Sequence, residues 1–283
     1  MARIKITCDS TCDLTEEIYR KYDIEVVPLG VVLGDELRRD GVNVSERDLF
    51  AFTEQTGTLP KTSAISVGEY AELFRKYVDQ GYSVIHVNLS SGLSVCHANA
   101  CMAAEEVGNV WPIDSLNLSS GSGHLVMTAA EMAAEGYGPQ EIADRLNVLR
   151  ERLDVSFVLQ TLEYLHKGGR CSGVALLGAN LMKIRPEIRV VDGGMKVGRK
   201  LRGSMRSTVL NYIRLQLENR TDIDTRRIFL THTEMPRELV DEALELVRSL
   251  HPFDEVIETM ASSTISSHCG PACLGVLFYK KGE

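Results

Sequence analysis

The chain has 283 residues and lacks any apolar run of about 18 residues that could cross a bilayer as a helix. Its opening residues enter a strand pattern at once, without the charged and apolar regions of a secretory signal peptide. We therefore expect a cytoplasmic protein. Internal repeats and low-complexity segments are missing as well, which argues against a solenoid or a disordered chain. Apolar residues make up 44% of the sequence and charged residues 25%, as is typical of globular proteins.

An excess of positive charge is also missing. The formal net charge of −8 at pH 7 argues against nucleic acid as a partner and against bulk attraction to anionic membranes. The positive side chains concentrate between about residues 167 and 206. They include Arg170, Lys183, Arg185, Arg189, Arg199, Lys200, Arg202 and Arg206. Two interpretations of this concentration stay open, a solvated hairpin face and a docking surface for an acidic or nucleotide-bearing partner.

Motifs for metal, redox and ATP chemistry are absent from the sequence. The seven cysteines form no Cys-x-x-Cys pair, and the group of His268, Cys269 and Cys273 has no second ligand pair at metal spacing. We expect no metal site and free thiols that pack as small hydrophobic side chains. No P-loop is present, so we expect no ATP hydrolysis by this chain. The Gly-x-Ser-x-Gly elbow of α/β hydrolases is missing too.

The first half of the chain alternates between strand and helix patterns. Strands are predicted at 4–8, 83–87 and 110–113, and helices at 16–22, 95–107 and 124–135. This alternation predicts a mostly parallel sheet in a doubly wound α/β arrangement. Residues 24–33 form another apolar run, which Pro28 and Gly30 make an edge strand or a bent one. The segments 34–41 and 58–64 are predicted as a charged turn and a loop.

The second half has a different pattern. A strand is predicted at 155–159, a helix of small residues at 172–183, and a β-hairpin around the Asp192-Gly193 turn. Residues 266–271 are predicted to form a rigid, exposed loop that presents His268. We therefore predict two α/β domains. They are an N-terminal domain at 1–154 with a mostly parallel sheet and a C-terminal domain at 155–283 with a mixed sheet.

Hydroxyl side chains gather in the stretch from Asn88 to Cys101. Ser90, Ser91 and Ser94 lie between the end of a predicted strand and the start of a predicted helix. Unpaired amide groups and the positive end of the helix dipole favour an anion there, and ligands of α/β sheets gather at this edge. The sequence therefore predicts a carboxylate or phosphate site. The alternative is a serine-rich N-cap that only begins a helix.

Further hydroxyl groups and one late histidine add to the candidate residues. Thr62 and Ser63 follow Pro60, and the segment 119–122 holds three more serines. A serine nucleophile, Ser94 or Ser91, with His268 as its base would give a hydrolase. No acidic residue near His268 in the sequence offers to orient that base.

Five short motifs occur along the chain in a characteristic order. They are Asp9-Ser10-Thr11 with Asp13-Leu14, Pro60-Lys61-Thr62-Ser63, Ser90-Ser91-Gly92-Leu93-Ser94, Lys167-Gly168-Gly169-Arg170, and His268-Cys269-Gly270-Pro271. Together they resemble the bacterial DegV family, whose best-understood members are the fatty-acid-binding subunits of fatty acid kinase. The family often has Ser-Gly-Thr where this chain has Ser94-Val95-Cys96, and Gly-Pro-Gly where it has Gly270-Pro271-Ala272.

The resemblance implies a long-chain fatty acid as the ligand, held between the two α/β domains, and no further cofactor. Thr62, Ser94 and His268 would hold its carboxylate, with Ser63, Ser91 and Gly270 beside them, and the acyl tail would lie in an apolar tunnel. The chain would carry out no catalysis of its own. It would present the carboxylate to a separate ATP-dependent kinase subunit, which forms the acyl phosphate.

The resemblance also implies a docking role for the basic segment. Arg170, Arg199 and Arg202 are the candidates for contacting the kinase subunit or, transiently, a membrane surface. Two alternatives to the carrier function remain, the Ser94–His268 hydrolase and a binder of another small anion.

Overall fold

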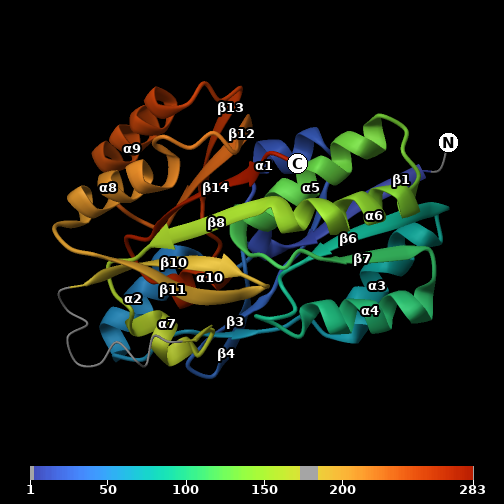
Figure 1. Ribbon diagram of the computed structural model, residues 1–283. Coiled ribbons are helices and arrows are strands. Elements are labelled where there is room, and N and C mark those ends of the chain that lie inside the picture. The colour runs from blue at the N-terminus through green and yellow to red at the C-terminus, as the bar shows by residue number, and fades with distance from the viewer. Residues whose placement is uncertain (1–2, 173–183, 283) are drawn as a thin grey trace.

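The computed structural model describes residues 3–172 and 184–282 and contains three β-sheets with helices packed around them (Figure 1). Within the described residues, no helix has both the length and the apolar character needed to cross a membrane. Apart from Ser172, the helix predicted at 172–183 lies outside the described residues. The two segments of chain together form a mixed α/β fold, as the sequence predicts.

The first sheet is fully parallel and has the order β2-β1-β6-β7. Its strands are β1 (Arg3–Asp9), β2 (Glu25–Val27), β6 (Tyr82–Asn88) and β7 (Val110–Asp114). All four run in the same direction, so their carboxyl ends meet at one edge. Asp9, Asn88 and Asp114 are the last residues of three of these strands. The predicted parallel sheet is therefore confirmed, and it brings these polar residues to one edge.

The second sheet has three short antiparallel strands in the order β4-β3-β5. They are β3 (Gly30–Leu33), β4 (Glu36–Arg39) and β5 (Lys61–Ser63). The prediction of a turn at 34–41 was wrong for the residues of β4, and the prediction of a loop at 58–64 was wrong for the residues of β5. Both are edge strands that pair with β3, and their polar side chains are compatible with this position because one side of an edge faces solvent. Pro28 lies between β2 and β3, which belong to different sheets.

The third sheet is mixed and has seven strands in the order β13-β12-β14-β8-β10-β11-β9. The strands are β8 (Leu153–Val158), β9 (Cys171–Ser172), β10 (Arg185–Val191), β11 (Gly194–Leu201), β12 (Ile223–His232), β13 (Glu255–Met260) and β14 (Leu274–Lys280). The predicted hairpin is confirmed as β10 and β11. Asp192 and Gly193 turn it with φ values of 53° and 74°, the left-handed region that Gly and Asp tolerate best.

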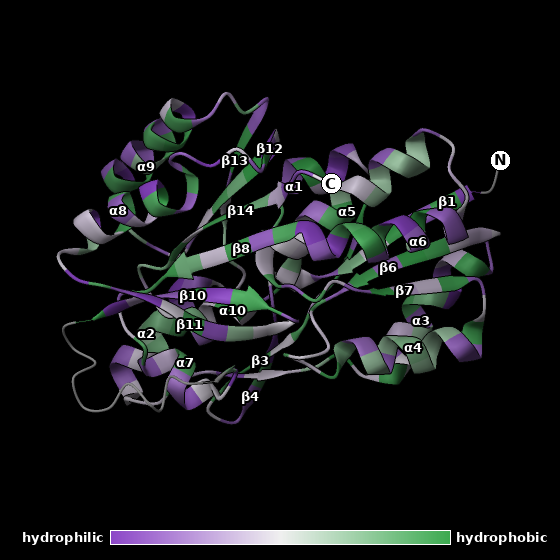
Figure 2. Cartoon of the chain, viewed as in Figure 1, coloured by the Kyte–Doolittle hydropathy of each residue, from purple (hydrophilic) through white to green (hydrophobic). Residues whose placement is uncertain are grey.

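Ten α-helices are assigned within the described residues. They are α1 (Glu16–Lys21), α2 (Glu46–Thr56), α3 (Val67–Val78), α4 (Cys96–Val107), α5 (Ser119–Ala134), α6 (Pro139–Leu149), α7 (Glu163–Gly168), α8 (Met205–Leu217), α9 (Arg237–Leu250) and α10 (Ser263–Cys269). Short 3₁₀ turns occupy Ser10–Cys12 and Arg150–Arg152. In Figure 2, hydrophilic and hydrophobic residues alternate along α8 and α9, as expected for helices with one buried face.

Helix α5 connects the parallel sheet with the mixed sheet. It contacts β1 and β6 of the parallel sheet and β8, β12 and β14 of the mixed sheet. Leu125 of α5, Ile85 of β6 and Leu277 of β14 belong to one hydrophobic cluster. The two halves of the chain therefore share core packing, and the division at residue 154 stays a prediction.

Two helix boundaries differ from the predictions. Helix α5 begins at Ser119 rather than His124. Residues 263–269, predicted in part as an exposed loop, form α10, so His268 lies in the last turn of a helix and is half-buried. The serine-rich sequence of α10 is a weak helix former. Tertiary contacts with buried aspartates compensate, as the next subsection describes.

Candidate functional site

A cavity of about 580 Å³ contains most of the residues that the sequence singled out. Thr62, Ser63, Ser91, Ser94, Arg170 and His268 all line it. They come from β5, the loop before α4, the segment after α7, and α10. Four regions distant in sequence therefore meet at one cavity.

His268 and Thr62 make the central polar contact of this cavity. The Nε2 atom of His268 lies 3.0 Å from the Thr62 hydroxyl, over a sequence separation of 206 residues. Burial, together with the positive charge of Arg170, lowers the pKa of His268 to about 4. The imidazole is therefore neutral near pH 7 and carries one N–H group.

The serine loop, residues 89–95, is anchored by partners at the ends of β1 and β7 and in the β10–β11 turn. The Leu89 amide donates to Asp9 at 2.8 Å, and the Ser91 amide donates to Asp114 at 3.1 Å. The hydroxyl of Ser90 donates to the Gly193 carbonyl at 2.6 Å, which ties the loop to the β10–β11 turn. These bonds use backbone groups and Ser90, so they leave the Ser91 side chain free to face the cavity.

Ser94 combines a helix-start contact with a position in the cavity. Its hydroxyl oxygen accepts a hydrogen bond from the Cys96 amide at 3.2 Å and lies 3.1 Å from the Cys96 thiol. The serine-rich helix start and the anion site were alternatives in the sequence. The structure shows the helix-start contact and places the same residue at the cavity wall.

Two buried aspartates hold the start of α10. Asp40 accepts hydrogen bonds from the amides of Ser263 and Thr264, and Asp13 accepts one from the amide of Ser262. Burial raises the pKa of Asp13 to about 7. These contacts orient the helix that carries His268, and they explain how a weak helix former is stable here.

Gly270 and the serines at 119–122 lie outside the cavity lining. Gly270 is buried, and its carbonyl accepts a hydrogen bond from Thr233 at 2.9 Å. Its φ is 71°, and a β-carbon on this residue would stand 2.6 Å from a ring carbon of Tyr164, so there is no room for a side chain. Ser119 donates to Asp13, and Ser120 and Ser122 bond to Thr231 and Ser115. The three serines of the segment 119–122 therefore form hydrogen bonds inside the protein and do not face the cavity.

Apolar side chains complete the cavity, and the sequence did not identify them as cavity residues. They include Leu29, Leu89, Leu118, Met195, Ile265 and Cys269. Leu118, Ile265 and Cys269 also line a neighbouring void of about 30 Å³, whose walls include Val155 and Phe157 of β8. Only the apolar pattern of each predicted strand or helix signalled these residues, and that pattern does not separate a cavity wall from ordinary core.

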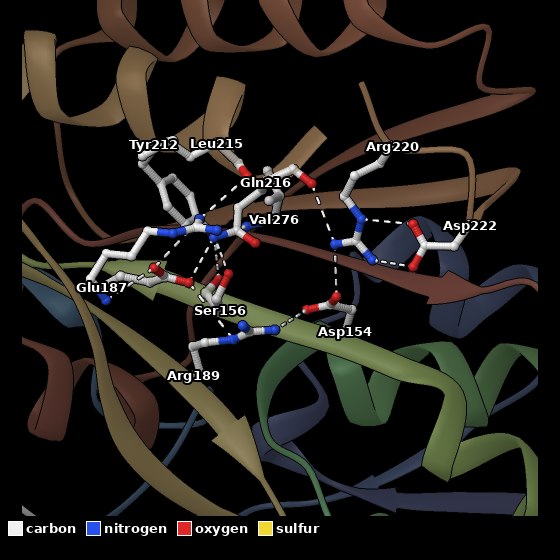
Figure 3. Close-up of polar contacts among 11 residues, drawn as sticks. Asp154, Ser156, Glu187, Arg189, Tyr212, Leu215, Gln216, Arg220, Asp222 and Val276 are labelled. Carbon is white, nitrogen blue, oxygen red and sulfur yellow. Dashed lines mark hydrogen bonds and ion pairs between the residues drawn. The ribbon is translucent and has the colours of Figure 1, made fainter. Parts of the chain in front are cut away.

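The basic residues of the hairpin differ in how firmly they are held. Figure 3 shows the polar network behind β10, in which Gln216 donates to the buried Glu187 at 2.7 Å and Arg220 donates to Asp154 at 2.8 Å. The Arg199 guanidinium lies 3.8 Å from the same Glu187 carboxylate. Arg202 is exposed, and no hydrogen bond or ion pair of its side chain occurs with the described residues. Neither Arg199 nor Arg202 lines the cavity.

The described residues offer no group of three or more His, Cys, Asp or Glu side chains that could hold a metal ion. All seven cysteines have free thiols, as predicted. The cavity thus presents hydroxyls, one neutral imidazole and one arginine on walls that are otherwise apolar. These features define a mixed α/β protein whose interior cavity combines a polar cluster with an apolar lining.

The comparisons with known proteins agree with this description. The model of the DegV family matches residues 3–281, and the chain belongs to this family. A DegV domain-containing protein of Clostridium acetobutylicum is 32% identical over 287 residues, which cover 99% of this chain and 100% of the relative.

Solved structures show the same fold. A fatty-acid-binding DegV family protein from Thermus thermophilus has 27% identity and a TM-score of 0.87, over 99% of this chain and 100% of that one. A stearic acid-binding protein from Eubacterium ventriosum has 26% identity and a TM-score of 0.86, over 99% of both chains.

Proposed function

We propose that this protein binds a long-chain fatty acid, with the carboxylate at Thr62, Ser94 and His268 and the acyl tail against the apolar walls. The observation that carries the proposal is the cavity of about 580 Å³ in which these three side chains meet apolar residues. Pockets for small molecules commonly have such a volume and a small number of polar groups on apolar walls. The fatty acids bound by the two solved relatives support the same ligand class.

The polar residues suit an ionised carboxylate. Thr62 and Ser94 supply hydroxyl groups, and Arg170 adds a positive charge at the cavity. Hydrogen bonds to a charged group contribute about 1.5–3 kcal/mol each, and a buried polar group that is left without its partner costs free energy. The head-group contacts would therefore fix the orientation of the ligand. Ser63 and Ser91 line the same cavity, and we propose that they add to these contacts.

The acyl tail would supply most of the affinity. Burial of each methylene group contributes about 0.8 kcal/mol, so ten of them outweigh any single hydrogen bond. We propose that the tail runs past Leu118, Ile265 and Cys269 toward the neighbouring apolar void, because these three residues line both spaces. The length of the preferred acyl chain would depend on how far these three side chains can move apart to open the void.

The contacts of Ser94 and His268 support a carrier over a hydrolase. In the described structure His268 bonds to Thr62, and Ser94 bonds to Cys96, so the nucleophile–base contact is not formed. A fluorophosphonate probe separates the two functions. Labelling that disappears in Ser94→Ala would establish a reactive serine and contradict the carrier proposal.

We further propose that a separate kinase subunit uses the bound fatty acid. Arg170 lies at the cavity, and the exposed Arg202 is free to meet an acidic surface of that partner. The test is ATP consumption by a fatty acid kinase catalytic subunit supplied with the lipid-loaded chain. Arg202→Glu is expected to lower the turnover while oleate binding stays unchanged. Equal turnover with Arg202→Glu would remove this residue from the proposed contact surface.

Lipid identification tests the proposal directly. We expect native mass spectrometry of the purified protein to show a stoichiometric adduct, which denaturing extraction identifies as a fatty acid. The triple variant Thr62→Ala/Ser94→Ala/His268→Ala should carry less of it while retaining the wild-type circular dichroism spectrum. An empty protein that also takes up no added fatty acid would contradict the proposal. A polar phosphorylated ligand would favour the small-anion alternative.

A single hydroxyl gives a sharper prediction. Thr62→Val keeps the side-chain shape and removes the hydroxyl, so we expect the dissociation constant for oleate to rise about tenfold, measured by calorimetry. Thr62→Ser, which keeps the hydroxyl, should bind within a few-fold of the wild type. Thr58→Val is a matched control, because Thr58 is exposed and lies outside the cavity lining. Unchanged affinity in Thr62→Val would show that this hydroxyl does not contact the ligand.

A further inference from the structure

Gly168 lies against the ring of His268. A β-carbon on Gly168 would stand 2.5 Å from the Nδ1 atom of His268 and 3.3 Å from Cε1. Carbon and nitrogen atoms cannot approach so closely without a shift of one group. The site therefore requires glycine at this position. The Lys167-Gly168-Gly169-Arg170 motif and the histidine motif thus meet in space.

This packing leaves Nδ1 of His268 without a hydrogen-bond partner. The atom is buried, and no described residue donates to it or accepts from it. The other ring nitrogen, Nε2, has the Thr62 hydroxyl 3.0 Å away. The two nitrogens of one ring therefore have different surroundings, one without a polar partner and one beside a hydroxyl.

The contrast between the two nitrogens determines where the single ring proton lies. A proton on Nδ1 would leave a buried N–H group with no acceptor, which is rare in folded proteins. A proton on Nε2 is donated to the Thr62 oxygen and leaves only an unused lone pair at Nδ1, a less costly defect. The second arrangement satisfies the N–H group.

We propose that Gly168 is a positioning residue that holds His268 as the Nε2–H tautomer, so that Nε2–H donates to Thr62 and the Thr62 hydroxyl donates to the ligand. This inference rests on the proposed function and deepens it. His268 acts through Thr62, and its role is to direct the hydroxyl proton into the cavity. Ser94 is held differently, because its oxygen accepts the Cys96 amide at 3.2 Å and its own proton is directed to the Cys96 sulfur at 3.1 Å.

The direction of these hydrogen bonds defines the head group that the site accepts. The Thr62 hydroxyl proton points toward the ligand, so the ligand must supply an acceptor oxygen. An ionised carboxylate supplies only acceptors, whereas a fatty amine in its ammonium form supplies only donors. We therefore expect oleate to bind and oleylamine, with the same tail, to bind at least tenfold more weakly.

Nitrogen-15 NMR of histidine-labelled protein at pH 7 tests the tautomer. The signals of His268 are assigned by their loss in His268→Gln. We expect the long-range correlation pattern of an Nε2–H imidazole. A pattern of Nδ1–H or of the charged ring would overturn the proposal, whether or not the protein binds a fatty acid.

The variant Gly168→Ala tests the positioning role. We expect it to alter the tautomer pattern of His268 and to raise the dissociation constant for oleate about tenfold. Gly68→Ala is the matched control, since it also changes a helical glycine and has open space around the new β-carbon. A wild-type tautomer and wild-type affinity in Gly168→Ala would overturn the proposal.

A second variant keeps the test valid if Gly168→Ala does not fold. Thr62→Val removes the acceptor of Nε2–H, so we expect the NMR pattern of His268 in this variant to differ from the wild-type pattern. An unchanged pattern would overturn the proposed donation from His268 to Thr62. Failure of the wild type to bind oleate would instead contradict the proposed function and leave the tautomer result to be judged separately.

Discussion

Asp9→Ala is expected to lower the free energy of unfolding by about 3–5 kcal/mol, the loss typical of removing one partner from a buried charged network. Asp9 is fully buried at the end of β1. Its carboxylate accepts hydrogen bonds from the Tyr70 hydroxyl at 2.6 Å and the Leu89 amide at 2.8 Å. The ring of His86 and the side-chain amide of Asn88 lie around the same oxygens. Removing the carboxylate takes the buried acceptor away from the Tyr70 hydroxyl and the Leu89 amide.

Urea unfolding measures this loss and allows a graded comparison. Tyr70→Phe removes one donor and keeps the ring, so it is expected to cost only about 1.5–3 kcal/mol. Asp9→Asn keeps the shape and half of the acceptor capacity, and it should fall between the other two variants. A cost below about 1 kcal/mol for Asp9→Ala would show that water or a shifted side chain replaces the carboxylate.

The same contact connects stability with the site. The Leu89 amide that donates to Asp9 begins the serine loop, and Leu89 itself lines the cavity. We therefore expect Asp9→Ala to weaken oleate binding as well, although Asp9 does not touch the cavity. Asp9, in the first of the five motifs, therefore positions the serine loop, which contains the third motif.

The sequence predicted the elements of the site better than their arrangement. Ser94 was identifiable because it lies between a predicted strand and a predicted helix, where ligands of parallel sheets collect. Thr62 was identifiable only as a hydroxyl residue close to Pro60 and from its motif. His268 was identifiable as a candidate from its residue type and its motif. Its helix was not, because α10 depends on Asp13 and Asp40, which lie more than 200 residues away in the sequence. Local propensity cannot anticipate a helix start stabilised by such distant carboxylates.

The short strands were missed for a related reason. Glu36–Arg39 and Lys61–Ser63 carry polar side chains with no apolar alternation, and they pair only because β3 offers an edge on each side. Pairing of this kind is decided by the partner strand. The presence of Thr62 on such an edge strand brings it within 3.0 Å of His268. The contact at the centre of the site therefore arises from long-range pairing.

His124 is expected to make stability depend on pH. The ring is buried between Phe229 and Tyr279, and its Nε2 atom lies 3.0 Å from the Leu277 carbonyl. Burial lowers its pKa to about 3, with the positive charges of Arg227 and Arg226 acting in the same direction and Asp224 against them. An unfolded histidine titrates near pH 6.5. Between these two values the unfolded chain binds more protons, so this residue removes stability as the pH falls.

Linkage gives the size of this effect as about 2 kcal/mol between pH 7 and pH 5. Asp13 and Glu46 oppose it, because burial raises the pKa of each to about 7 and the folded state then binds more protons over the same range. The pH dependence of the wild-type unfolding free energy therefore does not isolate His124. The difference in this pH dependence between a His124 variant and the wild type does. His124→Gln keeps a donor for the Leu277 carbonyl but has no ring to protonate.

Urea unfolding at pH 7 and pH 5 gives the required comparison. We expect the change in unfolding free energy from pH 7 to pH 5 to be more favourable by about 2 kcal/mol in His124→Gln than in the wild type. His166→Gln, an exposed site, should reproduce the wild-type difference. Equal differences for His124→Gln and the wild type would mean that His124 stays neutral in the unfolded chain or takes up a proton in the folded one. Because the variant is compared with itself at two pH values, any loss of packing at residue 124 cancels.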